Sequence, residues 1–270
     1  MKKTLKIVVL AKQVPDTRNV GKDAMKEDGT VNRAALPAIF NPEDLNALEQ
    51  ALVLKDMFPG STVEILTMGP GRAAEIIREG MYRGADGGVL LSDRKFAGSD
   101  TLATSYALSR AAINMKPDII VAGRQAIDGD TAQVGPQISE HLGLPVISYA
   151  QKIREVNEAE KYIVVERQYD DRYHVVKAQL PCLLTALAEL NEPRYMTPGG
   201  IFDAYAKEIT VWGRKDLKEV EDSNLGLKGS PTQIAKASDK VRKGAGEKVE
   251  LDPAASADYI VGKLAEKHII

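Results

Sequence analysis

Apolar and polar positions along the first 150 residues predict a succession of buried strands and amphipathic helices. Continuous apolar runs are typical of strands covered on both faces, and they occur at residues 5–11, 63–68, 89–91, 119–122 and 145–149. Between these runs, helical spacing and start signals predict a helix that begins at 41–44 and helices over 72–83, 100–115 and 130–142. Alternation of this kind indicates an α/β fold with a doubly wound, mostly parallel sheet, for which we expect strand order 3-2-1-4-5.

The pattern changes beyond residue 150. Residues 162–167 and 173–178 are rich in β-formers and are separated by two aspartates, which predicts an added β-hairpin. A further strand is predicted at 182–187 and a short helix at 255–267, with an irregular, Gly-, Ser- and Lys-rich stretch over 223–248 between them. We therefore expect a nucleotide-binding α/β domain with a hairpin over residues 1–190 and an extended C-terminal arm within residues 191–270.

Composition excludes several classes of function. The 270 residues carry 36 Lys and Arg against 38 Asp and Glu, a balance that argues against a nucleic-acid partner or an anionic membrane surface. The apolar run at 7–11 is shorter than the 7–15 residues, roughly, of a secretory signal, and no run approaches the ~20 residues that span a bilayer, so we expect a cytoplasmic protein. A single cysteine and three scattered histidines predict neither a disulfide framework nor a metal site of the cysteine-rich or HExxH type.

The strongest local signal for a ligand is the segment 123–136, which follows the predicted strand at 119–122 and leads into the next helix. Open parallel sheets bind ligands beyond the carboxyl ends of their strands, where the winding reverses, and amides at a helix start can hold phosphate oxygens. Gly129 and Gly135 would allow close backbone approach, Thr131 offers a hydroxyl and Gln133 can bond a sugar or a phosphate. If strands one and four are neighbours, the loop at 12–16 faces this segment across one crevice.

Two carboxylates in the same segment complicate this interpretation, because Asp128 and Asp130 would repel a phosphate. We expect Asp130 to cap the helix, so that the amides and Thr131 face the ligand. An acidic capped turn without a ligand and a Mg²⁺ site built from both aspartates are the alternatives.

A second candidate is the turn at 69–74, Gly-Pro-Gly-Arg-Ala-Ala. It matches GxGxxA between a strand and a helix, and Asp93 follows 22 residues beyond Gly71, as in a dinucleotide fingerprint. The match follows the second strand rather than the first, and a tight turn at the ligand edge of the sheet explains it equally well. Lys12 and Arg18 could neutralise a phosphate or could be solvated loop charges.

Several segments together resemble the small (β) subunit of electron-transferring flavoproteins, in that family's order and spacing over nearly the whole chain. The specific segments are 123–136 and the run Asn-Glu-Pro-Arg-Tyr at 191–195; weaker ones lie at 12–16, 41–44, 68–70 and 84–86. The resemblance implies a Rossmann-like domain that pairs with a large (α) subunit carrying one FAD. The small subunit then carries AMP or, in electron-bifurcating members, a second FAD.

The same resemblance implies where the nucleotide binds, and it implies no catalytic and no metal-binding residue in this chain. Contacts are expected from the ends of three strands, the first turn of the first helix and the 123–136 segment. The implied cofactor-binding residues are Leu10, Ala11, Asn41, Pro42, Asp44, Met68, Gly123, Arg124, Gln125, Asp128, Gly129, Asp130, Thr131, Ala132, Gln133, Val134, Gly135 and Pro136.

Two runs resemble the bifurcating version of the family, at 12–17 and at 128–136. The small residues Gly129 and Ala132 leave room for a diphosphate and a second flavin, so we expect FAD, with AMP as the alternative. In bifurcating relatives NADH delivers a hydride to this flavin. One electron goes to ferredoxin or flavodoxin, and the other passes through the large subunit's FAD to an acyl-CoA dehydrogenase-type partner.

The chain departs from many relatives after residue 195, where they carry a leucine in a loop that docks onto the dehydrogenase. We therefore expect docking through Tyr195, Met196, Ile201 and Phe202. The arm is expected to pack on the large subunit, and 223–248 to become ordered only there. Two other functions stay open: a non-bifurcating subunit that holds AMP structurally, and an AMP- or ATP-sensing module without a redox role.

Overall fold

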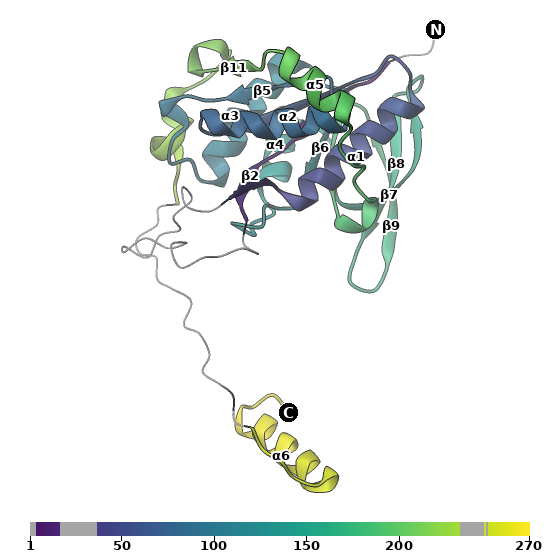
Figure 1. The fold of residues 1–270 in the computed structure, drawn as a ribbon, viewed down its shortest axis with the longest axis vertical. Coiled ribbons are helices and arrows are strands. Elements are labelled where there is room, and N and C mark those ends of the chain that lie inside the picture. The colour runs from purple at the N-terminus through teal and green to yellow at the C-terminus, as the bar shows by residue number, and fades with distance from the viewer. Residues whose placement is uncertain (1–3, 17–36, 233–245, 247) are drawn as a thin grey trace. The chain divides into compact units, whose positions relative to one another are not determined.

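The computed structural model describes residues 4–16, 37–232, 246 and 248–270 (Figure 1). Contacts divide the chain into two units, residues 1–236 and 237–270. The described part of the second unit contains one helix, α6 (Pro253–Glu266), close to the predicted span of 255–267. A functional division at residue 190 stays a prediction.

The first unit is built on a nine-stranded sheet, counted over the described residues, in the order β11-β5-β4-β1-β6-β10-β7-β8-β9. All neighbours from β11 to β7 are parallel, and β7, β8 and β9 form an antiparallel extension. The strands are β1 (Lys6–Leu10), β4 (Thr62–Met68), β5 (Gly87–Leu91), β6 (Ile119–Gly123), β7 (Val146–Asn157), β8 (Tyr162–Gln168), β9 (Tyr173–Gln179), β10 (Cys182–Ala186) and β11 (Thr210–Trp212).

The predicted order of the first four strands is confirmed, as are the hairpin and the strand at 182–187. The predicted neighbourhood of the fourth and fifth strands is wrong, because β10 lies between β6 and β7. Every residue of β10 is buried, whereas β7 becomes largely exposed as it runs into the hairpin. The central position therefore goes to the strand whose side chains are apolar on both faces.

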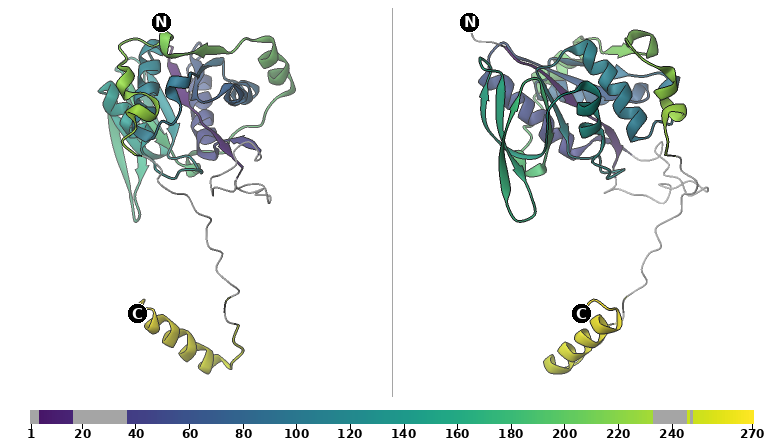
Figure 2. Two further views of the ribbon diagram at one scale, coloured as in Figure 1. Left: turned by 90° about the vertical axis from the view of Figure 1, so that its left-hand side faces the viewer. Right: turned by 180° about the vertical axis from the view of Figure 1, so that it is seen from behind.

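Helices cover both faces of the parallel part of the sheet (Figure 2). α1 (Pro42–Met57) and α2 (Ala74–Arg83) pack on one face, where Ile7 and Val9 point; α3 (Thr101–Met115) and α4 (Val134–Leu142) pack on the other, where Val8 and Leu10 point. The two cores follow from the alternation of side chains along a strand. A small antiparallel pair, β2 (Gln13–Pro15) and β3 (Ala38–Phe40), follows β1, and α5 (Pro198–Ala206) lies on α2.

The expectation that residues 223–248 become ordered only on the large subunit can be compared with the structure for part of this stretch. Residues 223–232 are tied to this chain at several points: Leu225 and Ser230 are buried, and the Leu227 amide donates to the Ala97 carbonyl. The expectation of partner-dependent order is therefore wrong for them. Residues 233–245 and 247, like Arg18, lie outside the described residues. Among the helices that are described, none has the length and apolar character needed to cross a bilayer.

Candidate functional site

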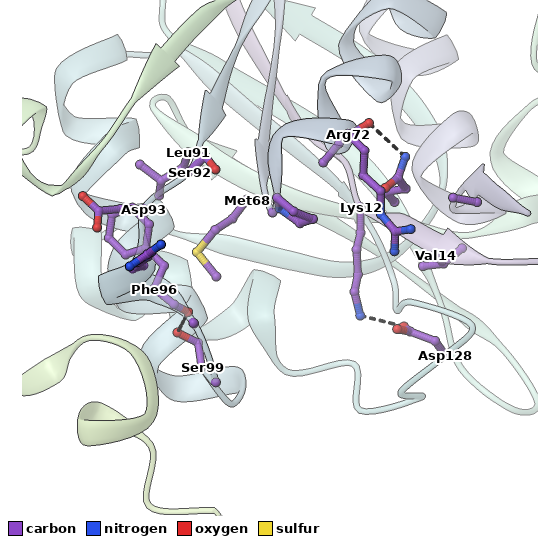
Figure 3. A pocket seen from close by; sticks show the side chains of 18 of the residues that line it. Lys12, Val14, Met68, Arg72, Leu91, Ser92, Asp93, Phe96, Ser99 and Asp128 are labelled. Carbon is purple, nitrogen blue, oxygen red and sulfur yellow. Dashed lines mark hydrogen bonds and ion pairs between the residues drawn. The ribbon is translucent and has the colours of Figure 1, made fainter. Parts of the chain in front are cut away.

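A cavity of about 520 Å³ lies at the carboxyl ends of β1, β4 and β5 (Figure 3). Its size is within the range of roughly 300–1,000 Å³ that is usual for small-molecule sites. Its walls come from the segments after three strands and from one residue of the loop after β6: Lys12, Gln13, Val14, Pro15, Met68, Gly69, Pro70, Arg72, Ala73, Leu91, Ser92, Asp93, Arg94, Phe96, Ala97, Gly98, Ser99 and Asp128, with Ala38 from β3.

The cavity adjoins the point at which the winding of the sheet reverses. The chain leaves β1 toward β4 and β5 and later returns to β6 on the other side of β1, which is where open α/β sheets bind ligands. An ion pair crosses this point, with Lys12 Nζ 2.6 Å from Asp128 Oδ1. The Asp128 side chain is nearly buried and that of Lys12 is half exposed. The pair partly neutralises the carboxylate that was expected to repel a phosphate.

Asn41 holds the loop after β6 in place. The residue is fully buried, its Nδ2 donates to the Gln125 carbonyl at 2.9 Å, and its Oδ1 accepts from the Ile127 amide at 3.1 Å. Asn41 occupies the N-cap position of α1 as predicted, but its side chain makes no capping bond. These two side-chain bonds run to the loop after β6, 84 and 86 positions away.

Asp44 joins the ends of β1 and β6. Its Oδ2 accepts from the Lys12 amide at 2.9 Å and its Oδ1 from the Gly123 amide at 3.0 Å. Burial raises the pKa of Asp44 to about 7, although these two hydrogen bonds act in the opposite direction. Both oxygens accept hydrogen bonds from backbone amides, so the Asp44 side chain holds the segments after β1 and at the end of β6 together.

Glu43 completes this arrangement and was missed by the sequence analysis. Its Oε2 accepts from the Gln125 amide at 3.0 Å, and its Oε1 lies 2.8 Å from Arg124 Nη2. The segment 41–44 was predicted as a helix start, and Glu43 was not among the implied contact residues. The expected neighbourhood of strands one and four was the signal that could have placed Glu43 against the 123–127 loop.

The expectation that Asp130 caps the fourth helix is wrong. α4 begins only at Val134. Asp130 and Ala132 adopt left-handed backbone angles, φ +49° and +52°, and a right-handed helix cannot pass through them. Asp130 is exposed and accepts from Gln125 Nε2 at 3.0 Å. The cap position is Gln133, whose side chain instead accepts a hydrogen bond from Thr101 Oγ1 at 2.8 Å.

The start of α4 still offers donors for a phosphate. The first amides of a helix have no partner within the helix, and here these include Val134 and Gly135, whereas Pro136 has no N–H. Gly135 lets the helix approach β10, since a Cβ there would lie 2.9 Å from the Thr185 methyl carbon. Neither aspartate is aimed at a shared cation: Asp128 faces Lys12 and Asp130 faces Gln125. Over the described part of the chain, no cluster of three or more potential metal ligands is found.

The predicted residues therefore fall into distinct groups. Met68 and Asp128 line the cavity, and Leu10 and Ala11 are buried at the end of β1. Four residues of the 69–73 turn also line it, so the GxGxxA match lies at the same edge of the sheet as the cavity. Gly129, Asp130, Thr131 and Gln133 are exposed beside α4. Apart from Asp93, which was singled out with the GxGxxA match, the wall from Leu91 to Ser99 was missed, although it follows the third predicted strand at the same edge.

The residues expected to dock a partner lie on a separate part of the surface. Tyr195 is 92% exposed and Phe202 78%, while Met196 and Ile201 are about half as accessible. They belong to the segment that runs from Asn191 into α5. None of them lines the cavity.

Comparison with known proteins gives full-length relatives. The profile of the electron transfer flavoprotein domain matches residues 28–221. The chain is 48% identical to electron transfer flavoprotein subunit beta of Clostridium acetobutylicum, with 98% of this chain and 100% of the relative covered. It is also 48% identical to the caffeyl-CoA reductase-Etf complex subunit CarD of Acetobacterium woodii and 44% identical to the acryloyl-CoA reductase electron transfer subunit gamma of Anaerotignum propionicum, with the same coverage.

Proposed function

This chain belongs to the electron transfer flavoprotein family as a beta-type subunit, and we propose that it holds FAD in a heterodimer that takes electrons from NADH and bifurcates them. One electron goes to ferredoxin or flavodoxin, and the other goes through the FAD of the large subunit to an acyl-CoA dehydrogenase-type flavoenzyme. The observation that carries the proposal is the cavity beside the winding reversal, where the carboxyl ends of β1, β4 and β5 meet the Lys12–Asp128 pair.

The residues around the cavity fit a dinucleotide. Met68, Leu91 and Phe96 supply an apolar wall for a ring system, while Lys12 and Arg94 supply positive charge for phosphates. A side chain at Gly129 would meet no atom within 4 Å, so space is open beside the 128–133 loop. When bound, FAD supplies the redox chemistry, accepting two electrons and releasing them one at a time.

The residues of this chain bind and orient the cofactor and neutralise the charge of its phosphates. Asn41, Glu43 and Asp44 hold the 123–127 loop, so that the first amides of α4 and the Thr131 hydroxyl can contact the pyrophosphate. Lys12 offsets the charge of phosphate oxygens. The 69–73 turn, with the Arg72 side chain, is the proposed wall for the nicotinamide nucleotide.

The partners are proposed on two grounds. Membership of the family implies a large subunit, and two relatives are named as parts of a caffeyl-CoA reductase complex and of an acryloyl-CoA reductase. A flavoenzyme of the acyl-CoA dehydrogenase type is thus the proposed acceptor, docked through Tyr195, Met196, Ile201 and Phe202. These side chains present an apolar surface outside the nucleotide cavity.

The flavin count tests the cofactor. The chain is purified together with its large subunit, and flavin and AMP are quantified per heterodimer after denaturation. Two flavins support the proposal. One flavin with one AMP indicates an ordinary electron carrier with structural AMP, and no flavin indicates a nucleotide sensor.

A substitution at Gly129 tests the place of the cofactor. Gly129→Arg puts bulk and charge where the diphosphate and flavin pass, so we expect the small-subunit flavin to fall below half occupancy while the large-subunit flavin stays. The matched control is Gly87→Arg at the amino end of β5, where a Cβ also meets no atom within 4 Å. Full occupancy in Gly129→Arg would show that the cofactor lies elsewhere.

A further inference from the structure

The segment before the proposed docking residues is fastened to α1 by a buried carboxylate. We propose that Glu49 of α1 is a positioning residue that presets the docking segment, residues 195–202, by holding Arg194. The inference rests on the docking role proposed above for this segment, and it adds the device that fixes its conformation.

Glu49 accepts hydrogen bonds from both the main chain and the side chain of Arg194. The Arg194 main-chain amide donates to Glu49 Oε2 at 2.9 Å, its Nε to the same oxygen at 2.9 Å, and its Nη2 to Oε1 at 3.0 Å. Arg194 Nη2 also lies 2.9 Å from Oδ2 of the exposed Asp56. Glu49 is 7% exposed, so its charge is stabilised by this arginine rather than by water. A lysine cannot reproduce this fork of donors.

The main chain on both sides of Tyr195 and Met196 is held as well. Asn46 Nδ2 donates to the Asn191 carbonyl at 2.7 Å, and Asn191 Nδ2 donates to the Asn46 carbonyl at 3.0 Å. The Thr197 amide donates to the Tyr82 carbonyl at 3.0 Å. Tyr195 and Met196 therefore lie between two fixed points, one on α1 and one on α2.

The outer side of the same segment has the opposite character. Tyr195 is almost fully exposed although its neighbour Arg194 is anchored, and Phe202 projects from the first turns of α5. Apolar side chains on a backbone that is already ordered before binding lose less conformational entropy than side chains on a flexible loop. Such an arrangement favours a partner that buries aromatic side chains. It also gives the buried ion pair between Glu49 and Arg194 a role in ordering the docking segment.

The test uses the holo-heterodimer with Glu49→Gln, which keeps the shape of the side chain but removes its charge and one acceptor. We expect amide hydrogen exchange in residues 191–197 to become about tenfold faster. With an acyl-CoA dehydrogenase that the wild-type heterodimer reduces, we expect the KM for this acceptor to rise about tenfold, with kcat and flavin content unchanged. The control is Glu166→Gln, which removes an equally buried carboxylate paired with Arg154 on the hairpin and should move neither quantity.

The outcomes separate the inference from the function on which it rests. Unchanged amide hydrogen exchange in Glu49→Gln would show that Glu49 does not hold the segment, which overturns the proposed clamp between Glu49 and Arg194. Faster exchange with an unchanged KM would overturn the role of this clamp in docking. If the wild type reduces no such dehydrogenase, the proposed function fails while the exchange measurement still judges the clamp. Should Glu49→Gln not fold, Arg194→Lys is measured in the same way, with the same expectations.

Discussion

Replacing Gly123 with alanine is expected to break the junction of β1, β6 and α1 beneath the cavity. An added Cβ would lie 2.4 Å from Asp44 Oδ1, 2.7 Å from the Glu43 carbonyl carbon and 2.8 Å from the Asp44 amide nitrogen. Two of these atoms belong to the backbone of α1, so no rotamer change can relieve the overlap. The first turn of the helix must move away from the strand.

The magnitude follows from two contributions. Overpacking of this kind costs about 1–3 kcal/mol. Displacing Asp44 also weakens the hydrogen bonds from the Lys12 and Gly123 amides, which costs on the order of 1 kcal/mol more. A total of roughly 3 kcal/mol corresponds to a fall in Tm of about 6–12 °C for a domain of this size.

The assay is thermal unfolding of the heterodimer followed by far-UV circular dichroism. The matched control is Gly129→Ala in the same loop, where an added Cβ meets no atom within 4 Å and should change the free energy of unfolding by less than about 0.5 kcal/mol. If Gly123→Ala melts within about 1 °C of Gly129→Ala, the junction does not have the role assigned to it.

Three further predictions concern the site and its partners. Lys12→Gln removes the cation next to Asp128 and should weaken retention of the nucleotide about tenfold at low salt, with a smaller loss at high salt; equilibrium dialysis measures this, and a loss independent of salt would contradict it. Burial raises the pKa of Asp44 to about 7, so its contribution to stability is complete below about pH 4 and is lost as the pH rises through 7. The free energy of unfolding should therefore fall by ~4 kcal/mol between pH 4 and 8 relative to Asp44→Asn in urea unfolding, and parallel pH profiles would refute the shift. Deleting residues 196–202 should abolish electron transfer to the dehydrogenase and leave nucleotide binding intact; unchanged transfer would reject the docking role.

Local signals in the sequence were sufficient for most of the elements. The apolar runs predicted β1, β4, β5 and β6 because a strand covered on both faces is predominantly apolar. The helix predicted over 100–115 is confirmed as α3, which begins at Thr101 and is capped by Asp100 through the Ala103 amide. In these cases the deciding interaction lies within a few residues of the signal.

The same kind of signal failed where a side chain had a distant partner. Asn41 and Asp130 both have the character of helix caps, yet neither makes a capping bond: Asn41 binds the loop at 125–127, and Asp130 adopts a left-handed turn outside the helix. Capping propensity describes what a residue can do locally. Packing of α1 against the end of β6 offered Asn41 other donors and acceptors.

Neighbouring residues were enough to predict the alternation of strands and helices, the doubly wound sheet and the hairpin, because burial and backbone preference are visible in the local sequence. Three features became visible only in the folded chain: β10 separates β6 from β7, residues between 91 and 99 line the cavity, and Glu49 meets Arg194 across 145 positions. These contacts depend on which elements pack side by side, and periodicity along the chain carries no information about that.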